Sequence, residues 1–189
     1  MTDQPADHLR AFLKSLGLDA SVDDQLADTP ERVTELFGEL FAGLHTDPPS
    51  PSTFAPPKTQ EDPDPVGIAA LPFQSMCAHH LLPFFGTVDV AYLPAEQMVG
   101  FGSIARIVDH FARRPQVQER MIAQIAEHIE ETLNPRGVLV RLRARQLCME
   151  MRGAEKTGEL ISIAGRGQLA DGSLRGQLLD EFNRAGPSL

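Results

Sequence analysis

The residues whose types and spacing could support metal chemistry are the two cysteines of this chain and a pair of neighbouring histidines. Cys77 is followed by Ala78, His79 and His80, and Cys148 lies near the end of a strand-like segment. Thiolate sulfur and imidazole nitrogen are preferred ligands of Zn²⁺, and a site with three protein ligands keeps a fourth tetrahedral position for water. The pattern therefore favours a catalytic zinc site. Paired histidines also fit a capped loop or a structural zinc, so these alternatives stay open at this point.

Glu119 is a second residue with specific chemistry available to it. A carboxylate can accept two hydrogen bonds from a ligand that presents two adjacent N–H donors. A glutamate in the first turn of a helix is also favourable simply because it faces the positive end of the helix dipole. From the residue alone, the helix-dipole interpretation is favoured over ligand binding.

Composition restricts the class of partner. The net charge of −9 argues against a general nucleic-acid-binding surface, so an anionic ligand needs a local basic pocket. The sequence holds no run of about 18 apolar residues that could span a membrane. Its N-terminus lacks the basic and apolar regions of a signal peptide, and its two cysteines do not suggest a disulfide framework. We therefore expect a cytoplasmic protein that binds neither nucleic acid nor membrane.

Three parts of the chain can be distinguished. Residues 1–45 are predicted to form a helical arm, whose second helix has Thr29 as N-cap and Pro30 at its first position. The first helix, which stops at Gly17, is marked by apolar residues on one face: Leu9, Phe12, Leu13 and Leu16. The proline-rich residues 46–65 suit an extended linker. Residues 66–189 then form the domain that carries the candidate site.

Strand and helix patterns alternate along this domain, which predicts an α+β fold in which an antiparallel sheet carries two helices on one face. The expected strands are Val66–Met76, Phe84–Leu93, Val138–Met149 and Leu160–Leu169. The expected helices are a short one around Ile104–Phe111 with Ser103 as N-cap, a second that starts at Pro115 and ends near Leu133, and a closing helix Leu174–Phe182.

Alternation along the third strand predicts which side chains accompany Cys148. Gln146 lies two residues earlier and should share its face, about 7 Å away. The opposite face carries Arg141, Arg143 and Arg145, which we expect to be solvated or to lie at an interface.

Three motifs resemble those of the GTP cyclohydrolase I family. Ser75–Phe84 resembles the family's zinc-binding signature. Arg106-Ile107-Val108 with Arg113–Arg120 resembles the second signature, and Cys148–Gly153 resembles the third. This resemblance implies the tunnelling fold and a homo-oligomer, a decamer of two stacked pentamers. It also implies conversion of GTP and water to 7,8-dihydroneopterin triphosphate and formate.

The resemblance also implies residue roles. Cys77, His80 and Cys148 would be the Zn²⁺ ligands, and His79 would carry protons for the purine nitrogens. Glu119 would bind guanine, with Gln118 as a lesser polar contact beside it. Arg106 and Arg152 would bind phosphate oxygens.

Two departures from the family pattern affect the expected activity. Phe101-Gly102-Ser103 stands where family members usually read Leu-Ser-Lys, so Ser103 occupies the position of a phosphate-binding lysine. Gln146 replaces a histidine that serves as an additional acid/base, and an amide cannot carry a proton at neutral pH. We consider an ordinary cyclohydrolase and a divergent one that uses fewer phosphates or stops at the ring-opened formamide. The third hypothesis is a non-catalytic, zinc-stabilised protein that binds a purine or pterin or regulates a partner.

Overall fold

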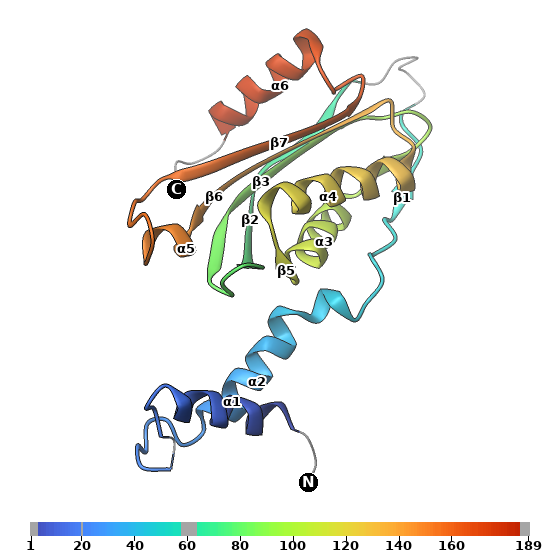
Figure 1. Cartoon of the computed structure of the whole chain (residues 1–189). Helices are drawn as coiled ribbons and strands as arrows, with labels where there is room; N and C mark the ends of the chain where they lie inside the picture. The colour runs from blue at the N-terminus through green and yellow to red at the C-terminus, as the bar shows by residue number, and fades with distance from the viewer. Residues whose placement is uncertain (1–3, 20, 58–63, 186–189) are drawn as a thin grey trace. The chain divides into compact units, whose positions relative to one another are not determined.

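The computed structural model describes residues 4–19, 21–57 and 64–185. The chain forms two compact units, Met1–Ala42 and Gly43–Leu189, which are described separately. Figure 1 shows the elements of each.

The N-terminal unit holds two helices, α1 (Pro5–Ser15) and α2 (Thr29–Leu40). The N-cap of α2 is Asp28, one residue before the expected Thr29, and Pro30 lies in the first turn. Arg10 joins the two helices, because its guanidinium donates to Glu31 at 2.5 Å. This ion pair links elements that bury little apolar surface: no residue of α1 is buried.

The larger unit is built on a five-stranded sheet in the order β5-β2-β3-β6-β7. Four strands pair antiparallel: β2 (Val66–Cys77), β3 (Pro83–Leu93), β6 (Gly137–Gln146) and β7 (Glu159–Gly167). The short β5 (Pro115–Gln116) runs parallel to β2. The segment that precedes β2 contributes β1 (Thr53–Phe54), which pairs with β4 (Met98–Val99). Part of the expected linker, residues 58–63, lies outside the described residues.

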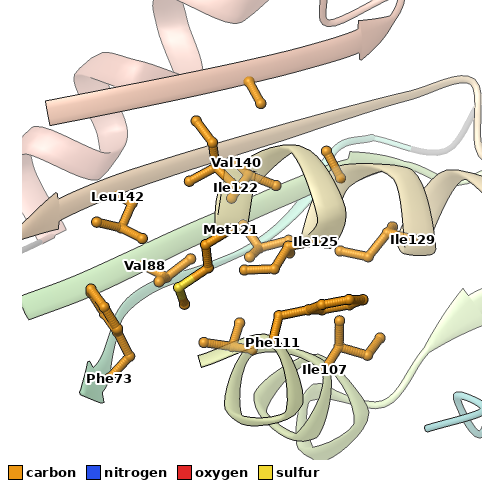
Figure 2. Packing of buried hydrophobic residues seen from close by; sticks show 14 of the residues in the cluster. Phe73, Val88, Ile107, Phe111, Met121, Ile122, Ile125, Ile129, Val140 and Leu142 are labelled. Atoms are coloured by element: carbon orange, nitrogen blue, oxygen red, sulfur yellow. The ribbon is translucent and has the colours of Figure 1, made fainter. Parts of the chain in front are cut away.

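Two helices cover one face of the sheet, α3 (Phe101–Ala112) and α4 (Gln118–Leu133). The core between these layers is apolar and buried (Figure 2). Its members include Phe73, Val88, Val140 and Leu142 from the strands and Ile107, Phe111, Met121, Ile125 and Ile129 from the helices. The predicted α+β architecture, with two helices on one face of an antiparallel sheet, is confirmed.

A third helix, α6 (Gly172–Ala185), lies on the opposite face of the sheet (Figure 1). Phe182 of α6 packs there against Leu93 and Leu139. On the same side Arg141 is buried and donates to Asp89 at 2.8 Å. Arg141 also bonds Asn183 of α6. The expectation that Arg141 is solvated or at an interface is therefore wrong, because α6 covers it and Asp89 neutralises its charge.

Helix boundaries near the candidate site differ from the sequence expectations. Gly100 is the N-cap of α3, so Ser103 lies inside the first turn and is buried. Pro115 belongs to β5 instead of opening a helix, and α4 starts at Gln118. A proline is compatible with this position because β5 is an edge strand, which does not need every ladder hydrogen bond.

The strand that was expected to reach Met149 ends at Gln146, and Leu147–Glu150 forms the short helix α5. Arg145 stabilises the change of direction by a bidentate pair with Glu150, with Nε–Oε1 at 3.0 Å and Nη2–Oε2 at 2.6 Å. Arg145 therefore lies in an ion pair. Strand alternation stops before Cys148, so the argument that placed Gln146 and Cys148 on one strand face does not hold.

Candidate metal and substrate site

A tight turn after β2 brings Cys77 and the two histidines together. The Cys77 N–H donates to the Leu82 carbonyl at 2.9 Å, and the Leu81 N–H donates back to the Cys77 carbonyl at 2.8 Å. Leu81 adopts a left-handed backbone with φ of 51°, which closes the turn. The Nδ1 atoms of His79 and His80 each lie 3.9 Å from Cys77 Sγ.

Cys148 reaches this turn from α5. One ligand atom each from Cys77, His80 and Cys148 lies within 4.8 Å of the others. A tetrahedral zinc with bonds of about 2.0–2.3 Å keeps its ligand atoms roughly 3.4–3.8 Å apart. The arrangement of two sulfurs and one nitrogen fits a zinc ion with small side-chain adjustments.

The electrostatics of the two thiols also fit a cation. Burial raises the pKa of the Cys148 thiol, and its hydrogen bond with Cys77 and the charge of that neighbour raise the pKa further, against a lowering effect of Arg152. The Cys148 thiol therefore resists ionisation in the protein alone. A divalent cation reverses this preference, because metal binding requires and stabilises the thiolate.

Arg152 contacts the other nitrogen of His80, with Nη1 2.6 Å from Nε2. A guanidinium only donates hydrogen bonds, so Nε2 must accept and the imidazole proton must sit on Nδ1. A metal bound at Nδ1 would move that proton to Nε2 and abolish the contact. Metal binding through Nδ1 of His80 is therefore incompatible with the present hydrogen bond from Arg152.

A cavity of about 370 Å³ opens beside the three-residue cluster. Its lining brings together six of the residues expected from the sequence, which are Cys77, His79, Gln118, Glu119, Gln146 and Cys148. Glu119 is exposed in the first turn of α4. One cavity, of a size that suits a small ligand, is thus lined by the imidazole of His79, the carboxylate of Glu119 and two metal-ligand candidates.

Hydrogen bonds within the cavity wall join three elements. Nε2 of Gln146 donates to Oε1 of Gln118 at 2.8 Å. Nε2 of Gln118 donates in turn to the Leu160 carbonyl at 3.0 Å and to Ser162 Oγ at 3.1 Å. Gln118 is only 2% exposed. Sequence reasoning missed Leu160 and Ser162; strand alternation on β7 could have placed Ser162 on the helix-covered face, but nothing signalled its partner.

The three phosphate candidates, Ser103, Arg106 and Arg152, lie outside this cavity lining. Ser103 is buried, and its Oγ accepts hydrogen bonds from the Ser52 N–H at 3.1 Å and from Arg106 Nη2 at 2.9 Å. Arg106 itself is exposed on α3. The structure therefore does not bring Arg106 and Ser103 to the metal cluster of the same chain.

Comparison with known proteins shows the family of this chain. The family model for GTP cyclohydrolase I matches residues 6–183. The chain belongs to the GTP cyclohydrolase I family. A relative from Carboxydothermus hydrogenoformans, named GTP cyclohydrolase 1, is 44% identical over 164 residues, which cover 86% of this chain and 84% of the relative. A second protein of that name, from Geobacillus kaustophilus, is 42% identical over 174 residues and covers 90% and 91% of the two chains.

Among solved structures, the apo form of the archaeosine synthase QueF-Like aligns with 55% of this chain and 96% of its own. The TM-score is 0.41 and the sequence identity 18%. Within the described part of this GTP cyclohydrolase I family member, no helix is long and apolar enough to cross a membrane.

Proposed function

We propose that this protein is a zinc-dependent cyclohydrolase that opens the imidazole ring of a guanine nucleotide at C8. The observation that carries the proposal is the cluster of Cys77, His80 and Cys148 beside a cavity that also holds Glu119 and His79. Family membership supports GTP as the nucleotide, since relatives at 42–44% identity are named GTP cyclohydrolase 1.

Zn²⁺ would be held by Cys77, His80 and Cys148, which supply the soft donor set that this ion prefers. When bound, the ion supplies Lewis-acid activation of water, whose pKa falls to about 7. Loading would also release Arg152 from His80, because the two contacts need different tautomers of that imidazole. Arg152 then becomes available for a phosphate oxygen.

The first step adds one water across the C8–N9 bond of guanine. The water oxygen goes to C8, the C8–N9 bond breaks, and the two protons of the water end on N7 and N9, which leaves a formamide on N7. His79 lies at the cavity and is the proposed proton carrier, because imidazole titrates near neutral pH. Glu119 orients the base by accepting from N1–H and the amino group.

The presence of Gln146 favours arrest of the reaction at the ring-opened formamide. The complete family reaction hydrolyses the formamide to formate and closes the pterin ring of 7,8-dihydroneopterin triphosphate, which needs further proton transfers. Gln146 lies in the cavity wall, bonded to Gln118, and its amide cannot supply a proton. Release of the formamide is therefore the proposed divergent outcome.

The phosphate requirement is proposed to be weaker than in the family. Ser103 is buried, and its oxygen already accepts two hydrogen bonds, so it does not replace a lysine. Arg106 lies outside the cavity of its own chain, and a second copy in a homo-oligomer, proposed as the family decamer, would have to supply it. We also propose a cytoplasmic location and the division into arm 1–45, linker 46–65 and catalytic domain 66–189.

The test is to compare turnover of GTP, GMP and ATP by the zinc-loaded protein and by Glu119→Gln. We expect the native protein to open GTP and GMP at comparable rates and to reject ATP. Glu119→Gln should lower the preference for GTP over ATP by about tenfold to hundredfold, since charge-assisted hydrogen bonds are worth roughly 1.5–3 kcal/mol each.

The matched control is Glu131→Gln, an exposed position near the other end of α4, which should leave the preference unchanged. Equal use of GTP and ATP by the native protein would remove guanine recognition from the proposal. A strict need for three phosphates would remove the relaxed phosphate requirement.

A further inference from the structure

The hydrogen-bonded chain from β7 through Gln118 to Gln146 has a fixed direction. The Leu160 carbonyl oxygen can only accept, so the Gln118 side chain must turn its NH₂ group toward β7. Ser162 Oγ lies at the same NH₂ group and accepts from it as well. The Gln118 amide therefore has one permitted orientation, with Oε1 toward Gln146.

This orientation dictates that of the next amide. Oε1 of Gln118 is an acceptor, so Gln146 must present its NH₂ group, and the 2.8 Å contact joins these atoms. Oε1 of Gln146 is then turned away from Gln118. No protein donor to this oxygen occurs within residues 4–19, 21–57 and 64–185. Since Gln146 lines the cavity beside Cys77 and Cys148, that oxygen is available to a ligand.

We propose that Gln118 and Ser162 are positioning residues that hold the Gln146 amide as a hydrogen-bond acceptor for the ring-opened formamide of the substrate. This inference rests on the proposed function. The imidazole edge of intact guanine offers the N7 lone pair and C8–H, and it has no N–H. After ring opening, both former ring nitrogens carry an N–H, and the formyl group adds a carbonyl.

The ring-opened species therefore matches the fixed amide better than the intact purine does. Oε1 of Gln146 accepts from a formamide N–H, whereas the same oxygen repels the N7 lone pair. The second N–H of Gln146 remains free to donate to the formyl oxygen. Position 146 thus favours binding of the ring-opened formamide over intact GTP, and Gln118 sets this preference without touching the ligand.

The test measures dissociation constants of two ligands, GTP and its ring-opened formamidopyrimidine form, on the zinc-loaded native protein. We expect the formamidopyrimidine to bind more tightly. Gln146→Met should lower the ratio of the two affinities by about fivefold, because one neutral hydrogen bond is lost. Gln118→Met should lower it by a similar factor, and Ser162→Ala by about twofold, because the Leu160 carbonyl still orients Gln118.

The control is Glu127→Met on the same helix. Glu127 is exposed and lies outside the cavity lining, so the affinity ratio should not change. The variant Gln146→Met keeps the buried Gln118 bonds to β7, which separates loss of the acceptor from loss of packing. An unchanged ratio in Gln146→Met, or a native protein that prefers intact GTP, overturns the inference and leaves the proposed hydrolysis standing. Failure of both ligands to bind overturns the proposed function and this inference together.

Discussion

At the scale of single residues, the proposed activity depends on the sulfur atoms of Cys77 and Cys148. Cys77 is fixed at the end of β2 by backbone hydrogen bonds on both sides of the turn, whereas Cys148 arrives on the four-residue helix α5. The two thiols influence each other, since Cys77 contributes to the raised pKa of Cys148. A cation beside the Cys148 thiol would favour its thiolate, so metal binding at this cluster would release a proton.

Removal of one sulfur tests this dependence. Cys148→Ala should reduce bound zinc from roughly one ion per chain to a small fraction of that, because two remaining ligands do not hold the ion. Elemental analysis of the purified variant gives the stoichiometry. Met151→Ala, a change at an exposed position just after α5, is the control and should retain the metal. Full zinc content in Cys148→Ala would exclude this residue as a ligand.

At the scale of elements, the close approach of β3 and β6 positions the cavity wall. A Cβ at Gly86 of β3 would lie 1.9 Å from the Arg143 carbonyl oxygen and 2.8 Å from the Ala144 Cα. Both neighbours are backbone, which cannot turn aside as a side chain would. Glycine at position 86 therefore allows β6 to lie close enough to β3 to deliver Gln146 and α5 to the site.

Gly86→Ala is expected to destabilise the protein by about 1–3 kcal/mol or more, the usual range for overpacking a tight contact. Chemical denaturation monitored by circular dichroism measures this free energy of unfolding. Gly176→Ala is the opposite control, because a Cβ there meets nothing within 4 Å and α6 is helical. It should stabilise by roughly 0.5–1 kcal/mol. Equal stability of the two variants would show that β3 and β6 can separate without cost.

The sequence predicted the elements better than their ends. The four main strands follow from their apolar and alternating patterns, because the face of the sheet that α3 and α4 cover is apolar. The end of β6 does not follow, since the apolar alternation continues to Cys148 while the pair between Arg145 and Glu150 stops the strand at Gln146. The contact of Gln146 with Gln118 joins β6 to α4 across 28 positions, and neither residue carries a pattern that announces it.

At the scale of the whole molecule, the candidates for base chemistry and for phosphate binding lie apart within one chain. Cys77, His79, Glu119 and Cys148 share a cavity, while Arg106 and Ser103 do not line it. In the proposed reaction, ring opening uses the first group, and firm binding of a polyphosphate needs a cation such as Arg106. We therefore propose that the hold on the phosphates depends on Arg152 and on neighbours that a homo-oligomer would provide.

The most direct test follows the carbon that reacts. GTP labelled with ¹³C at position 8 is incubated with the zinc-loaded protein, and the carbon resonance is followed by NMR. We predict that the purine signal disappears and that a formamide signal replaces it, with little formate, while chelation of the zinc stops the change. A label that stays in the purine ring in the presence of bound zinc, or leaves it equally well in metal-free protein, would contradict the central claim.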